Sequence, residues 1–163
     1  MKRFGLLGFL IGVIVLFVLL GTLFAENIND QDKRILVSNL VNEAVNLINT
    51  KGESAFAMIA DQNGKFNTKD TYVFITSGET GADLLNPAFR EVEGLPAENY
   101  GNLQTQAAQM AIVEAVKNKD TAWVEYLWPK PQESNLSRKI AFLRKIMING
   151  KERIVGAGYY PHE

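Results

Sequence analysis

The stretch TAWVEYLWPKPQESNLSRKIAFLRKIMINGKERIVGAGYY, from Thr121 to Tyr160, decides the fold of this chain. Residues 121–128 alternate between two faces, as expected for a strand. One face carries Trp123, Glu125 and Leu127, and the other carries Val124, Tyr126 and Trp128. Residues 139–148 and 153–160 are predicted to be two further strands, because Asn149-Gly150 between them is a strong hairpin signal. The stretch therefore predicts three consecutive antiparallel strands.

The sequence before these strands begins with two predicted helices. Apolar residues recur at helical spacing over about five turns, namely Ile35, Val37, Leu40, Val41, Ala44, Val45 and Ile48. Gly52 is a natural end for this helix, and residues 53–60 predict a short second helix. Asp61-Gln62-Asn63-Gly64 is predicted to be a turn, because the later ligands of a calcium loop are missing.

Between the helices and the three strands, residues 71–77 are β-branched and aromatic, which predicts a buried strand. Residues 82–85 predict a short return strand, residues 88–101 a long loop, and residues 103–118 a helix. The fold class is therefore α+β, with a five- to six-stranded antiparallel sheet and the long N-terminal helix on one face. The excursion over residues 78–118 is left to cover the other face, with a pocket beneath it.

The first 25 residues differ from the rest. Residues 4–25 carry no charge, follow Lys2 and Arg3, and are long enough to span a bilayer as a helix. A signal peptide cut after Ala25 and an uncleaved membrane anchor remain two alternatives, and both place residues 26–163 outside the cytoplasm. We expect residues 26–163 to form one domain in the periplasm, secreted or held at the inner membrane.

Composition excludes several function classes. With 17 basic and 18 acidic side chains, the chain lacks the basic excess of a nucleic-acid-binding protein. It has no cysteine, which excludes thiolate metal sites and cysteine nucleophiles, and its single histidine is His162. No serine therefore has a clear histidine partner, and Glu91 and Glu93 stand alone in a loop. We expect no catalysis, no metal and no cofactor.

Three segments resemble the single Cache domains of bacterial sensors (Cache type 2). They are residues 123–131 (WVEYLWPKP), residues 139–142 (KIAF) and residues 156–160 (GAGYY). The strand of residues 72–75, the Asn86-Pro87 turn and Gly94 occur in the expected order. The resemblance covers roughly residues 30–160 and implies a PAS-like, extracytoplasmic domain that binds short organic acids or similar metabolites. Because the chain ends just after the last strand, it resembles a stand-alone member of the family.

Two positions depart from the family pattern. The family often has His-Pro where this chain has Asn86-Pro87, and often Tyr where this chain has Phe142. Each change removes charge or hydrogen-bonding capacity. The resemblance therefore favours a small monocarboxylate or a neutral ligand over a hydroxy acid or a dicarboxylate.

A carboxylate in a half-buried site needs a cation or several hydrogen-bond donors. We assign the ligand-binding candidates to Tyr126, Trp128, Lys139, Lys130, Asn86, Phe142, Phe74 and Arg90. Tyr126 and Trp128 share a strand face and offer an O–H and an N–H group. Arg90 lies in the long loop, from which it can close over a ligand. Gly156 and Gly158 leave room on one strand face either for a ligand or for a crossing helix.

The sequence supports a sensor domain that acts through a partner signalling protein. Two alternatives remain open. One is a ligand-free accessory or interaction subunit of a sensor kinase or chemoreceptor system, and the other is a binding protein that scavenges solute for a transporter.

Overall fold

The computed structural model describes residues 30–68 and 71–161, so the predicted anchor or signal segment and His162 lie outside the described residues. From residue 35 onward, the described residues form one compact unit. Residues 30–51 are helical and lead into η1 (Gly52–Ser54) and α2 (Ala55–Ile59), as the apolar spacing predicted. None of the described helices is both long enough and apolar enough to cross a membrane.

Five strands form one sheet, and their bounds are β1 (Val73–Ser77), β2 (Asp83–Leu85), β3 (Thr121–Pro129), β4 (Leu136–Ile148) and β5 (Lys151–Tyr159). Their order is β2-β1-β5-β4-β3, and every neighbouring pair is antiparallel. Asn149 and Gly150 join β4 to β5 with φ angles of 51° and 75°. Both central residues of a type I′ hairpin turn need positive φ, so the predicted hairpin is confirmed.

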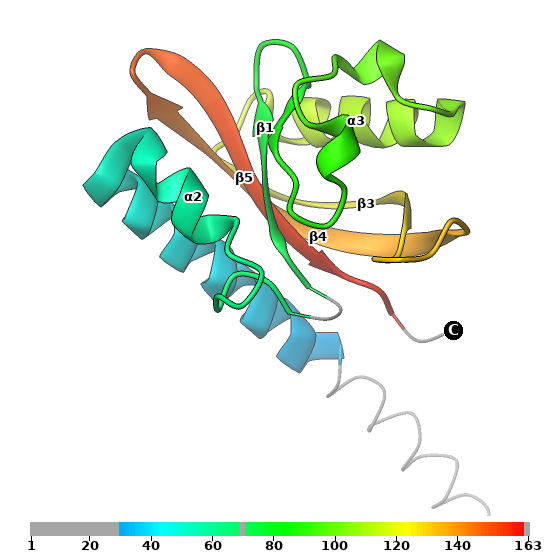
Figure 1. Cartoon of the computed structure of the whole chain (residues 1–163), viewed down its shortest axis with the longest axis horizontal. Helices are drawn as coiled ribbons and strands as arrows, with labels where there is room; N and C mark the ends of the chain where they lie inside the picture. The colour runs from blue at the N-terminus through cyan, green and yellow to red at the C-terminus, as the bar shows by residue number, and fades with distance from the viewer. Residues whose placement is uncertain (1–29, 69–70, 162–163) are drawn as a thin grey trace, which may run out of the picture. The chain divides into compact units, whose positions relative to one another are not determined.

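Each face of the sheet packs against helices, as Figure 1 shows. On one face the N-terminal helix contributes Val37, Val41 and Val45 to a core that includes Ile75 and Val155 of the strands. Because residues of a strand alternate between faces, the next side chains along each strand form a second core on the other face.

The second core lies under α3 (Leu103–Val116), which follows η2 (Arg90–Val92) and η3 (Ala97–Asn99). Its members include Phe74, Leu143 and Ile154 from the sheet and Ile112 and Val116 from α3. The prediction that the 78–118 excursion covers the face opposite the long helix is confirmed (Figure 1).

Candidate functional site

A small cavity lies on the α3 side of the sheet. It is lined by Tyr72, Phe74, Asp83, Asn86, Gln109, Ile112, Tyr126, Trp128 and Lys139. Its free volume is about 10 Å³, which is the space that one water molecule requires. The predicted pocket between sheet and excursion therefore exists, but side chains nearly fill it.

Lys139 of β4 places a cation in this cavity. The residue is 1% exposed, and its Nζ lies 4.0 Å from the ring centroid of Tyr72 and 5.4 Å from the centroids of Phe74 and Tyr160. Aromatic rings at these distances attract a cation through their negative faces. Among the described residues, no carboxylate lies within ion-pairing distance of Nζ.

Burial lowers the pKa of Lys139 from its usual 10.5 to about 7, because the low-polarity surroundings penalise the charged form. The negative charge of Asp83 acts in the opposite direction and raises this pKa. At neutral pH the side chain therefore exchanges readily between charged and uncharged forms. An anion entering the cavity would favour the charged form.

Asp83 of β2 supplies the buried carboxyl group. Its Oδ1 accepts from the hydroxyl of Thr76 at 2.9 Å, and its Oδ2 accepts from Nδ2 of Asn86 at 2.7 Å. Burial raises the pKa of Asp83, and these two hydrogen bonds act against that rise. Each oxygen of Asp83 thus accepts one hydrogen bond from a neighbour, and Asp83 forms no ion pair with Lys139 among the described residues.

The loop after β2 is held in place by backbone contacts. The backbone N–H of Asn86 donates to Glu93 Oε1 at 2.7 Å, and the N–H of Gly94 donates to the carbonyl of Asp83 at 2.7 Å. The hydroxyl of Tyr100 accepts from the N–H of Asp83 at 3.2 Å and from Gln109 Nε2 at 3.0 Å. These bonds fix Asn86 and Gln109 at the cavity wall.

Several polar atoms around the cavity have no partner. Among the described residues, the buried side-chain atoms without a hydrogen bond are Tyr72 Oη, Asn86 Oδ1, Gln109 Oε1, Trp128 Nε1 and Arg153 Nε. All but Arg153 belong to residues that line the cavity. Buried polar groups are nearly always paired in folded proteins. The cavity wall thus offers two donors and two acceptors in addition to Lys139.

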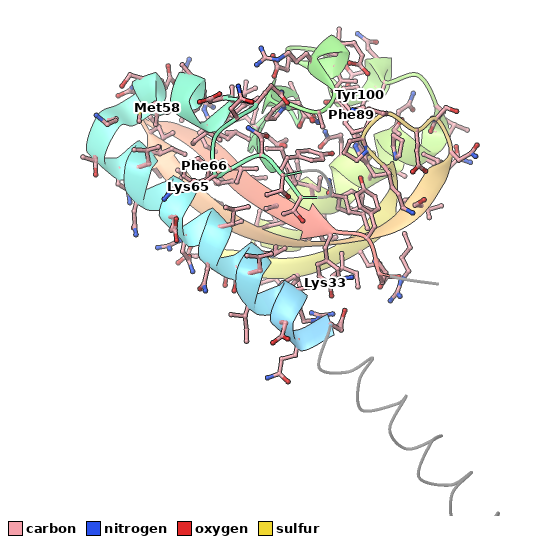
Figure 2. All side chains as sticks on the ribbon, turned by 60° about the horizontal axis from the view of Figure 1, so that its bottom comes forward. Lys33, Met58, Lys65, Phe66, Phe89 and Tyr100 are labelled. Carbon is pink, nitrogen blue, oxygen red and sulfur yellow. The ribbon has the colours of Figure 1, made fainter. Side chains whose placement is uncertain are left out.

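Aromatic rings form the rest of the wall. Trp128 of β3 makes edge contacts with Phe89 at 5.9 Å and with Tyr126 at 6.3 Å between ring centroids. Phe89 and Tyr100 lie on the α3 side of the molecule, away from the N-terminal helix (Figure 2). Burial raises the pKa values of Tyr72 and Tyr126 well above 10, so both hydroxyls stay protonated at neutral pH.

The glycines of β5 make room for side chains of the cavity. A Cβ on Gly158 would lie 2.9 Å from Lys139 Cε, and a Cβ on Gly156 would overlap the ring of Phe74. The atoms nearest to both added Cβ positions belong to β1 and β4, whereas a crossing helix was one of the two predictions for this pair. They are needed because Lys139 and Phe74 pass directly over them.

The structure brings five of the eight predicted ligand-binding residues to the cavity. These five are Phe74, Asn86, Tyr126, Trp128 and Lys139. Of these, Tyr126, Trp128 and Lys139 reach the cavity because alternation along β3 and β4 places them on one face of the sheet.

The other three candidates lie elsewhere, which corrects their predicted positions. Phe142 packs in the core of the opposite sheet face, with its ring 5.2 Å from that of Trp123. It is one residue out of phase with Lys139 and Ala141, so it cannot reach the cavity. Lys130 lines a separate groove, and Arg90 is exposed in η2.

Sequence reasoning missed four lining residues, namely Tyr72, Asp83, Gln109 and Ile112. Asp83 had a readable signal, since it is a single acidic residue within an apolar strand, where burial requires a partner. Gln109 had a weaker signal, as a polar residue beside the Ala-rich face of the predicted helix. Ile112 had none beyond ordinary helical spacing.

A larger groove of about 710 Å³ lies on the other side, beside the N-terminal helix. Its wall includes Met58 and Phe66 (Figure 2), and Lys65 crosses it to pair with Glu43 at 2.6 Å. Of the described residues that line it, the one cation is exposed and already paired, and none has an unpartnered buried polar atom. The small cavity is therefore the better candidate site. No group of acidic or histidine side chains suited to a metal ion occurs among residues 30–68 and 71–161.

Comparisons with known proteins agree with this fold. No family model and no curated protein matches the chain. Three solved structures are similar: the periplasmic sensor domain of a chemotaxis protein, a Cache chemosensory domain studied for carboxylic acid recognition, and a methyl-accepting chemotaxis protein from Vibrio parahaemolyticus.

The three alignments extend over most of both partners. The periplasmic sensor domain aligns with a TM-score of 0.62 and 21% sequence identity. The alignment covers 82% of this chain and 97% of the sensor domain. The Cache chemosensory domain has a TM-score of 0.61 and 20% identity, covering 83% and 95%. The Vibrio protein has a TM-score of 0.66 and 14% identity, covering 85% and 95%. The described part of this chain therefore has the PAS-like fold of a single Cache sensor domain.

Proposed function

We propose that this chain is an extracytoplasmic sensor domain that binds a small monocarboxylate in the cavity around Lys139 and acts through a partner signalling protein. The observation that carries the proposal is the buried, unpaired ammonium group of Lys139 among aromatic rings. An unpaired buried cation is costly, and a ligand carboxylate would remove that cost. The expected extracytoplasmic location rests on the uncharged residues 4–25 and on the periplasmic sensor domain with the same fold.

The remaining polar atoms suit the same ligand. Trp128 Nε1 and Tyr72 Oη can donate to the second carboxylate oxygen, because neither has a partner. A charged hydrogen bond of this kind contributes about 1.5–3 kcal/mol. The rings of Phe74 and Tyr126 would contact the alkyl part of the ligand.

The closed cavity limits the size of the ligand. A volume of about 10 Å³ is smaller than acetate, so side chains must rotate when a ligand enters. Asp83 also opposes a second negative charge, since its carboxyl group lines the same space. Both features favour a short monocarboxylate over a dicarboxylate. The carboxylic acid recognition of a Cache domain with the same fold supports this class of ligand.

A specific observation favours one alternative, the ligand-free accessory subunit. The cavity is nearly filled by the protein's own side chains, as expected if the fold serves only to contact a partner. The two functions differ in whether occupancy changes the stability of the domain.

A thermal-shift screen separates them, since a ligand that binds only the folded state raises the melting temperature. The panel would contain formate, acetate, propionate, butyrate, pyruvate, succinate and neutral amides at millimolar concentration. We expect stabilisation by one or more of the monocarboxylates and none by succinate. Absence of stabilisation by every compound would support the accessory subunit and refute the sensor proposal.

A further inference from the structure

A second hollow adjoins the cavity. It is a groove of about 570 Å³ whose rim includes Gln62, Pro87, Ala88, Lys130 and Glu133. Among the described residues, Tyr72 is the one that lines both the groove and the cavity. The groove is large enough for a small carboxylate, whereas the cavity is not.

The side chain of Tyr72 is the element that separates the two spaces. It is 2% exposed, and its ring packs against Phe89 at 6.2 Å and over Lys139 Nζ at 4.0 Å. Rotation of this one side chain would join the two spaces, because it lines both of them. The other lining side chains come from the sheet, from α3 and from Asn86 in the loop after β2, and none of them lines the groove.

The rim of the groove is held on both sides. Gln62 Nε2 donates to the carbonyl of Pro87 at 2.8 Å, and the hydroxyl of Tyr160 donates to the carbonyl of Pro129 at 2.6 Å. These bonds tie each rim segment to another part of the fold. The groove is therefore held in shape independently of the Tyr72 side chain.

The rim also carries two opposite charges. The turn after β3 places Lys130 and Glu133 on it, and the N–H of Glu133 donates to the carbonyl of Lys130 at 2.9 Å. A charge at the mouth of a narrow groove changes the local concentration of small ions. Lys130 would attract an anion and Glu133 would repel it.

We propose that this groove is the entrance through which a small carboxylate reaches the cavity, that the ring of Tyr72 is its gate, and that Lys130 attracts the anion at the mouth. The route rests on the proposed function. In this route, Tyr72 and Lys130 control the rate at which the ligand binds, while Lys139 holds the bound ligand.

The route can be tested without a ligand, because the chain has two tryptophans and no cysteine. In a Trp123→Phe background, Trp128 in the cavity is the one tryptophan and is excited selectively at the red edge of its absorption. Acrylamide serves as a neutral probe of access to it. Ala88→Cys on the rim is capped with a bulky maleimide. The matched control is a Met147→Cys variant that is capped in the same way. Met147 is 64% exposed and lies near the C-terminal end of β4, whereas Lys139 lies near its N-terminal end.

Capping at residue 88 should lower the acrylamide quenching constant of Trp128 severalfold, and capping at residue 147 should leave it unchanged. Equal quenching before and after capping at residue 88 would overturn the route. If Ala88→Cys does not fold, Pro131→Cys on the same rim replaces it.

Iodide tests the charges. Lys130→Gln should lower iodide quenching about twofold, the effect of one unit charge acting over roughly 8 Å of water, and Glu133→Gln should raise it. Neither should change acrylamide quenching. Iodide quenching that is the same in all three proteins would overturn the role of Lys130.

Propionate binding separates this inference from the proposed function. If propionate and its homologues do not bind the unmodified protein, the proposed function fails, while the quenching result still decides the route. If propionate binds and capping at residue 88 leaves its association rate unchanged, the route fails and the proposed function stands.

Discussion

Lys139 Nζ lies 4.0 Å from the ring centroid of Tyr72, inside a cavity that also contains the carboxyl group of Asp83, yet the two charged groups do not pair. Thr76 and Asn86 each donate a hydrogen bond to one oxygen of Asp83, and no ion pair joins Asp83 to Lys139 among the described residues. The site therefore keeps one cation without a counter-ion, at a cost in folding free energy. A ligand that binds the cation would offset this cost in folding free energy.

Lys139→Met should abolish monocarboxylate binding and stabilise the empty protein. Methionine has a similar length and no charge, so the penalty for burying the cation disappears while the packing is retained. At pH 6 the free energy of unfolding should rise by about 1–4 kcal/mol, as in other replacements of buried charges by apolar residues. Urea denaturation measures this change, and a variant less stable than wild type would contradict the account.

The contribution of Lys139 to the stability of the wild-type protein should rise with pH between about 7 and 10.5. In this window the unfolded chain, where lysine titrates near 10.5, binds a proton that the folded protein has lost because the pKa of Lys139 is about 7. Stability increases with pH wherever the unfolded state binds more protons. The slope contributed by Lys139 is at most about 1.4 kcal/mol per pH unit.

The matched control for this pH effect is Lys139→Met. Denaturation curves at several pH values should show that the difference in stability between the variant and wild type shrinks from pH 7 upward. A difference that stays constant between pH 6 and 10 would mean that Lys139 keeps an ordinary pKa.

Asp83→Asn should destabilise the fold and lower the pKa of Lys139 further. The substitution disrupts the charged hydrogen bonds from Thr76 and Asn86, which costs about 1–3 kcal/mol. It also removes the negative charge that raises the pKa of Lys139. The pH above which propionate binding weakens should therefore fall in the variant, as measured by calorimetric titration. An unchanged midpoint would show that Asp83 does not act on Lys139.

Gly158→Ala should displace Lys139 and weaken binding. The added Cβ would meet Lys139 Cε at 2.9 Å and the carbonyl oxygen of Ile140 at 2.8 Å, and overpacking of this kind costs about 1–3 kcal/mol. Gly101→Ala is the matched control, because nothing lies within 4 Å of its Cβ position. Equal melting temperatures and affinities for the two variants would be inconsistent with the packing described around Lys139.

Much of the fold was predictable because its local signals agree with one another. The alternation in β3, the Asn149-Gly150 hairpin and the helical spacing from Val37 to Ile48 each point to the element that forms. Pairing of β1 with β5 was not predictable from spacing, since these strands are distant in sequence and nothing local specifies the partner.

The site residues were predictable only where the alternation of side chains along a strand determines which face they occupy. Tyr126, Trp128 and Lys139 follow the pleat of β3 and β4, so their shared direction could be read from the sequence. Phe142 was assigned to the site from the family resemblance, and the pleat places it on the other face. Asp83 and Gln109 reach the cavity from a short strand and a helix whose orientation depends on the loop between them. No local pattern encodes that orientation.

The most direct test of the central claim is isothermal titration calorimetry of residues 30–163 with the monocarboxylate that stabilises the protein most, for wild type and Lys139→Met in parallel. The account predicts one saturable site in wild type and none in a folded variant. Equal affinity in the two proteins, or no heat of binding in wild type, would contradict the claim that Lys139 receives a ligand carboxylate.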